Sequence, residues 1–127
     1  MKKKIFVVDD DENITLSVKQ ALEYHNPVKY EVICVEDGKK CLELLKNDQI
    51  PDLILLDIMM PGMSGWMLSD RLKENPKWKK IPLVFLTART DDFAKKASSS
   101  ACDDYIEKPF DINNLEERIN QILKENK

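Results

Sequence analysis

Five polar residues stand at the ends of short apolar runs along this chain, and their types suggest a shared chemistry. They are Asp9, Asp10, Asp57, Thr87 and Lys108. A carboxylate that follows a buried apolar run needs a partner that offsets the cost of burying its charge. Carboxylate oxygens suit a hard divalent cation such as Mg²⁺, which keeps several of its waters. A carboxylate beside such a cation, an ammonium and a hydroxyl can attack a phosphoryl group.

The elements that would carry these residues alternate between strands and helices. Apolar, β-branched runs predict strands at residues 4–9, 30–36, 52–57, 81–87 and 104–108. Apolar residues at helical spacing predict helices at residues 12–24, 37–48, 64–75, 91–102 and 111–125. Strands that alternate with helices form parallel sheets covered on both faces. We therefore expect an α/β fold in which five parallel strands are flanked by five helices.

This arrangement predicts that the polar residues meet in one crevice. All strands of a parallel sheet end at the same edge, and open α/β sheets bind their ligands there. Asp9 and Asp10 would end the first predicted strand and Asp57 the third, while Thr87 and Lys108 would end the fourth and fifth. Carboxylates crowded at one edge repel each other unless a cation lies among them. Lys108 would add a compensating charge, and Thr87 could donate a hydrogen bond to a phosphoryl oxygen.

Length and composition fit one soluble globular domain. The chain has 127 residues, of which 43% are hydrophobic and 34% charged, and its formal net charge is −3. This charge gives no reason to expect a nucleic-acid or anionic-membrane partner. No apolar stretch is long enough to cross a bilayer. We therefore expect a cytoplasmic protein that binds neither nucleic acid nor membrane directly.

The cysteines and the tryptophan of one lysine-rich segment are interpreted as packing residues. Cys34, Cys41 and Cys102 are odd in number and show no C-x-x-C spacing, so we expect reduced thiols rather than metal ligands. The segment "NPKWKK" at residues 75–80 carries Trp78 among three lysines. A solvated loop with one packing aromatic explains that segment better than a nucleic-acid patch.

Taken together, the motifs resemble those of response-regulator receiver domains over essentially the whole chain. They are "VVDDDE" after the first predicted strand, "LLDIMMPGMSG" around Asp57, "FLTA" at the end of the fourth, and "DDYIEKPF". Each motif is common alone, but their order and their positions at strand ends are specific. The resemblance implies a single receiver domain over residues 1–127. It also implies a flavodoxin-like (CheY-like) sheet with strand order 2-1-3-4-5.

The same resemblance implies roles for the residues of the acidic edge. Asp57 is similar to the aspartate that accepts a phosphoryl group from a histidine kinase or a phosphotransfer protein. Asp9, Asp10 and Asp57, with the backbone carbonyl of Met59, would hold Mg²⁺ or Mn²⁺. No other cofactor is expected, because the chain contains neither G-x-x-x-x-G-K-[ST] nor G-x-G-x-x-G.

Three further residues resemble the switch of this family. Lys108 would contact the phosphoryl group, Thr87 would be the switch hydroxyl and Tyr105 the switch aromatic. The resemblance implies a signalling switch rather than an enzyme, with only self-phosphorylation and autodephosphorylation as reactions. Its unknown downstream protein would bind the face made by the fourth helix, fifth strand and fifth helix. Serine is a mediocre helix former, so "FAKKASSSAC" predicts a weak fourth helix.

Simpler alternatives remain open for these residues and for the function. Asp10 or Asp11 could cap the helix that begins near residue 12. Thr87 could merely close a strand, and Tyr105 could be an ordinary edge residue. An aspartate-nucleophile phosphatase is a second candidate, but such enzymes typically carry an acid where this chain has Met59. A binding module that never cycles phosphate is a third, and the complete polar set counts against it.

Overall fold

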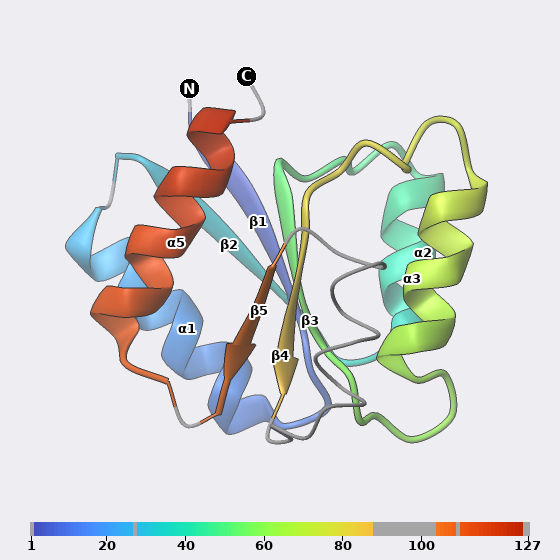
Figure 1. Ribbon diagram of the computed structural model, residues 1–127, viewed down its shortest axis with the longest axis horizontal. Helices are drawn as coiled ribbons and strands as arrows, with labels where there is room; N and C mark the ends of the chain where they lie inside the picture. Colours follow the sequence, from blue (N-terminus) through green and yellow to red (C-terminus); the bar gives the residue numbers. More distant parts are fainter. Residues whose placement is uncertain (1, 27, 88–103, 109, 126–127) are drawn as a thin grey trace.

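The computed structural model shows a central sheet with helices on both faces (Figure 1) and describes residues 2–26, 28–87, 104–108 and 110–125. The strands are β1 (Lys3–Val8), β2 (Tyr30–Val35), β3 (Leu53–Asp57), β4 (Leu83–Thr87) and β5 (Asp104–Glu107). The helices are α1 (Glu12–His25), α2 (Gly38–Lys46), α3 (Gly65–Glu74) and α5 (Ile112–Glu125). All neighbouring strands pair in parallel, in the order β2-β1-β3-β4-β5.

This order confirms the predicted fold class. The bounds of each described element agree with the predicted ranges to within two residues. The described part of the chain contains four helices where five were predicted, because the predicted helix at residues 91–102 lies outside the described residues. None of the described helices has the length and apolarity needed to cross a membrane.

The core consists of two layers, one on each face of the sheet. On β1, Ile5 and Val7 pack in the layer under α1 and α5, whereas Phe6 and Val8 pack in the layer under α2 and α3. Figure 1 shows these two helix pairs on opposite sides of the strands. Strands buried on both faces are apolar along their whole length, as expected for a parallel sheet. On β3 and β4 the polar residues Asp57 and Thr87 therefore stand at the strand ends.

Side-chain caps begin three of the helices close to the carboxyl edge of the sheet. The Asp11 carboxylate accepts a hydrogen bond from the Asn13 amide at 2.9 Å and starts α1. Asp37 and Ser64 start α2 and α3 in the same way. Such caps satisfy amides that would otherwise lack a partner at a helix start. Because Asp11 fills this role, the cap does not account for Asp10.

Burial tests the predictions for the cysteines and for the tryptophan. Cys41 is buried in the core layer under α2 and α3, and Trp78 is buried in the same layer, which confirms both as packing residues. Cys34 is exposed, so the prediction that it packs is wrong. It lies on the edge strand β2, where a small apolar residue is not fully covered. Cys102 lies outside the described residues.

Gly65 sets how closely α3 approaches the end of β3. Its amide donates a hydrogen bond to the Ile58 carbonyl at 2.9 Å. A Cβ at this position would lie 2.5 Å from the Asp57 carbonyl oxygen and 2.8 Å from the Ile58 Cα. Both contacts involve backbone atoms, which cannot rotate away as a side chain could. The close packing that holds Asp57 in place therefore requires glycine here.

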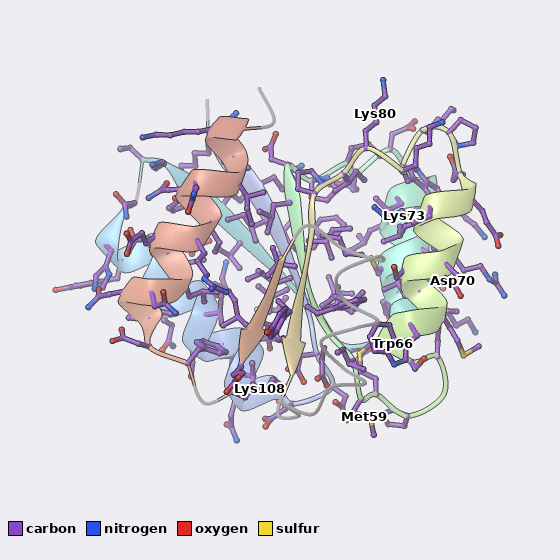
Figure 2. All side chains as sticks on the ribbon, viewed as in Figure 1. Met59, Trp66, Asp70, Lys73, Lys80 and Lys108 are labelled. Atoms are coloured by element: carbon purple, nitrogen blue, oxygen red, sulfur yellow. The ribbon has the colours of Figure 1, made fainter. Side chains whose placement is uncertain are left out.

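We predict that Gly65→Ala lowers the free energy of unfolding by about 1–3 kcal/mol, the usual cost of overpacking a filled site. The measurement is urea denaturation followed by circular dichroism. Asp70→Ala is the matched control on the same helix, since Asp70 is exposed and points away from the sheet (Figure 2). Equal stability of the two variants would show that α3 can move without cost.

Candidate functional site

The structure brings three predicted carboxylates together at the carboxyl edge of the sheet. Asp9 and Asp10 follow β1, and Asp57 is the last residue of β3. One oxygen from each of Asp9, Asp10 and Asp57 lies within 4.8 Å of the others. Asp9 and Asp57 are buried, with 1% and 6% of their surface exposed. Asp10 is exposed, so this acidic cluster opens to solvent on its side.

Lys108 lies between the two buried carboxylates. It follows β5, and Figure 2 shows it at the same end of the sheet as Met59. Its Nζ donates to Asp9 Oδ2 at 2.7 Å and to Asp57 Oδ1 at 3.3 Å. The other Asp9 oxygen accepts a hydrogen bond from the Asp11 amide at 2.9 Å. Asp9 is thus held from two sides, while Asp57 has the longer of the two contacts with the ammonium.

The acidic cluster carries more negative charge than Lys108 compensates. Burial, and after it the charge of Asp9, raise the pKa of Asp57 from 3.8 to about 6 overall, against the opposing effects of Lys108 and the Met59 amide. Burial lowers the pKa of Lys108, but its hydrogen bond to Asp9 and the charges of Asp57 and Asp9 outweigh that effect and raise it overall. Lys108 therefore stays charged, and an added cation would stabilise ionised Asp57.

The donor set fits a hard divalent cation. All three side chains of the acidic cluster offer carboxylate oxygens, and one of them faces solvent. Mg²⁺ binds few carboxylates and retains water molecules, so a half-open oxygen site suits it better than a closed cage. The Met59 side chain is 61% exposed and points outward beyond β3 (Figure 2). The backbone carbonyl of Met59 as an additional ligand stays a prediction.

The two predicted switch residues lie on the two strands farthest from β2. Thr87 is the last residue of β4 and pairs with Glu107 of β5, which places its backbone at the same edge as Asp57. Its side chain is outside the described part of the structure. Tyr105 is half-buried in β5 and packs against the core layer under α2 and α3. Their switching roles remain predictions.

Comparison with known proteins agrees with this geometry. The sequence pattern of the family described as "Response regulator receiver domain" matches residues 5–120. This chain belongs to that family. It is therefore a receiver domain of the kind found in two-component response regulators, and the resemblance in its strand-end motifs is confirmed.

Relatives of this receiver domain include transcriptional regulators and solved structures. Transcriptional regulatory protein CrdR of Helicobacter pylori (strain ATCC 700392 / 26695) is 37% identical over 126 residues, which cover 98% of this chain and 57% of that protein. Alkaline phosphatase synthesis transcriptional regulatory protein PhoP of Bacillus subtilis (strain 168) is 34% identical, with 98% and 50% covered. A CheY-like response regulator receiver domain protein from Methanospirillum hungatei JF-1 has a TM-score of 0.86 at 29% identity, with 99% and 97% covered. The chain spans about half the length of the curated relatives it matches.

Sequence reasoning missed one feature of this receiver domain, a groove beside the acidic cluster. A cavity of about 620 Å³ runs from Asp9 and Asp10 along the outer edge of β2, between α1 and α2. We call it the β2-edge groove. Cys34 and Glu36 line it from the strand side, and Glu43 lines it from α2. The only sequence signal was the position of β2 at the end of the expected strand order, which leaves one side of that strand unpaired.

The raised pKa of Asp57 predicts a pH dependence of stability without divalent cations. Between pH 3.8 and pH about 6 the folded state binds more protons at Asp57 than the unfolded state does. Stability from this group is therefore present at low pH and is lost as pH rises through about 6. Asp57→Asn should become more stable than the wild type by on the order of 1–2 kcal/mol above this window, allowing for solvent screening.

Urea unfolding in EDTA at several pH values measures this difference. Asp70→Asn removes an exposed carboxylate on α3 and should follow the wild-type curve. Parallel curves for the wild type and Asp57→Asn across the window would contradict the electrostatic account of the acidic cluster.

Proposed function

We propose that this receiver domain accepts a phosphoryl group on Asp57 and thereby changes the binding of a downstream protein. One observation carries the proposal: Asp57 ends β3 beside the Lys108 ammonium at 3.3 Å and within the acidic cluster. Asp9 destabilises the buried charge of Asp57, so a ligand or covalent group that compensates this charge changes the local energy strongly. Constitutive binding modules do not need such a group.

Each described residue has a distinct part in the proposed transfer. An oxygen of Asp57 attacks phosphorus, and the donor leaves with its former bonding electrons. Lys108, already held by Asp9 at 2.7 Å, is placed to donate to a phosphoryl oxygen without further ordering. Bound Mg²⁺, held by Asp9, Asp10 and Asp57, would supply positive charge for the phosphoryl oxygens. Attack by water on the phosphorus of the acyl phosphate would release inorganic phosphate and return Asp57 to its free carboxylate.

The proposed partners follow from the same role. A histidine kinase or phosphotransfer protein would supply the phosphoryl group, and this exchange would take place in the cytoplasm. The downstream protein would bind the face that the predicted fourth helix forms with β5 and α5. Two elements of that face are joined directly, since Arg118 of α5 donates to the Tyr105 carbonyl of β5 at 2.7 Å.

The energetics require more than one contact to change in the switch. A net hydrogen bond to a charged group contributes about 1.5–3 kcal/mol. Moving an equilibrium from 1:99 to 99:1 needs about 5.5 kcal/mol. A bond from Thr87 to the phosphoryl group would therefore be insufficient alone. Repacking of Tyr105, which is only half-buried, is the proposed source of part of the rest.

We predict that acetyl phosphate with Mg²⁺ adds one phosphoryl group to the wild type and none to Asp57→Asn. Intact-mass spectrometry measures the product directly. Asp111→Asn is the control, because Asp111 is exposed and caps the start of α5 through the Asn113 amide. This variant should be labelled like the wild type. Equal labelling of all three proteins would remove Asp57 from the role.

We further predict that Mg²⁺ raises the melting temperature of the wild type, since a ligand at about 100 times its dissociation constant adds about 2.7 kcal/mol of stability. Asp10→Asn should lose most of this increase. Asp11→Asn should keep it, because asparagine still caps α1 and Asp11 is outside the acidic cluster. Differential scanning calorimetry with and without EDTA gives the comparison. An equal response of both variants would place the ion elsewhere.

A further inference from the structure

The outer edge of β2 has no strand partner in the described sheet. It lies between α1 and α2. Backbone groups alternate along a strand, so every second residue of β2 directs its amide and carbonyl away from β1. The Asp9 amide donates to the Val35 carbonyl, and the Lys3 amide donates to the Lys29 carbonyl. The backbone amides and carbonyls of odd-numbered residues therefore point toward β1. Those of Tyr30, Val32 and Cys34 point away from β1.

Side chains and a turn occupy the first two of these outward positions. The Tyr30 amide donates to the Asn26 carbonyl at 3.2 Å. The Val32 amide donates to the Glu23 carboxylate at 2.8 Å, and the Val32 carbonyl accepts from Lys19 Nζ at 2.8 Å. Lys19 and Glu23 also pair with each other at 3.0 Å. This Lys19–Glu23 clamp closes the strand edge at Val32, as native edge strands are commonly protected.

The third outward position opens into the β2-edge groove. Cys34 is exposed and lines this cavity of about 620 Å³. Its thiol donates to the Thr15 carbonyl of α1 at 3.4 Å, so its side chain turns toward α1. Ile33 turns to the opposite face, where it packs on the core layer under α2 with Leu44. Ile33 and Leu44 thus form an apolar strip on the α2 side, beside Lys40, Glu43 and Asn47, while Glu12 and Thr15 line the α1 side.

The charge of the residues that line the β2-edge groove indicates which kind of segment can bind there. The charged residues that line it are Asp9, Asp10, Glu12, Glu36, Glu43 and Lys40. Lys108 already pairs with Asp9, so four further carboxylates against one ammonium leave the groove acidic. A second copy of this chain, presenting the same acidic edge, would be repelled. A basic segment would be attracted.

We propose that the β2-edge groove binds an extended, basic segment of a partner protein by strand addition at Cys34. Side chains of an added strand alternate between two faces, so one set would meet the acidic α1 side and the other the apolar surface of Ile33 and Leu44. The fitting segment alternates lysine or arginine with apolar residues. The proposal does not depend on phosphorylation of Asp57.

The clamp limits how long the added strand can be. Only the backbone beyond Val32 is open, so few hydrogen bonds can form and binding should be weak. Removing the clamp would expose the amide and carbonyl of Val32 to the incoming strand. The double variant Lys19→Ala with Glu23→Ala leaves the net charge unchanged, so simple electrostatic attraction predicts no gain in affinity. Strand addition predicts tighter binding.

The test uses the peptide acetyl-Lys-Val-Lys-Val-Lys-Val-Lys-amide, titrated into the ¹⁵N-labelled domain in EDTA without phosphodonor. We expect chemical-shift changes at Cys34, Glu36 and the facing residues of α1 and α2, and slower hydrogen exchange of the Cys34 amide. The clamp variant should bind about fivefold more tightly, the equivalent of one added hydrogen bond. Thermal melts confirm that each variant is folded.

Matched probes separate strand addition from charge alone. The same peptide with alternate backbone amides methylated keeps its charge but loses strand hydrogen bonds, and it should not protect Cys34. Glu36→Lys with Glu43→Lys should weaken binding, whereas Glu31→Lys, on the same strand but outside the groove lining, should change it much less. No binding at millimolar peptide, equal binding of the methylated peptide, or no gain in the clamp variant would each overturn the proposal.

Discussion

One ammonium group between two buried carboxylates is the interaction on which the carboxyl edge of this receiver domain depends. Lys108 binds Asp9 at 2.7 Å and Asp57 at 3.3 Å, so it satisfies the first acid better than the second. Removing Lys108 would leave two buried carboxylates without a compensating charge, which is strongly destabilising. This arrangement also leaves Asp57 with a raised pKa, because one positive charge cannot neutralise two negative ones. Lys108 compensates enough of the negative charge for the site to fold. The charge that remains uncompensated allows the site to respond to a cation or a phosphoryl group.

The scaffold around this interaction is closely packed on one side and is assembled from distant segments. Asp9 and Asp57 end neighbouring strands whose backbones are paired from Ile5 and Leu53 onward. Gly65 holds α3 against the end of β3. Lys108, in contrast, reaches the site from the edge strand β5. The position of the ammonium therefore depends on how β5 packs against β4, which offers a physical route from the acidic site to the β5 and α5 surface.

Alternating apolar runs predicted a parallel sheet and the meeting of Asp9, Asp10 and Asp57, because such runs place polar residues at one edge whatever the details of packing. The strand order itself came from the resemblance to receiver domains. The sequence did not distinguish the buried Asp9 from the exposed Asp10, since two neighbouring aspartates read alike until the chain direction at the strand end is known. It placed Cys34 among the packing residues, because an apolar residue on an edge strand does not show from its type whether a helix covers it. The Lys19–Glu23 clamp joins α1 to the backbone of β2, and local spacing carries no signal of such a contact.

The acidic cluster and the β2-edge groove share Asp9 and Asp10, and this sharing links their occupancies. A cation bound in the acidic cluster reduces the negative potential in the β2-edge groove, and a basic side chain in the groove reduces it in the cluster. Exposed charges interact over about 8 Å at physiological ionic strength, so neighbouring sites with common residues are within range. Because linkage is reciprocal, divalent cations that weaken binding of a basic segment must themselves bind more weakly in its presence. Binding at the acidic cluster and binding in the β2-edge groove would then weaken each other through charge alone, without any change in the fold between them.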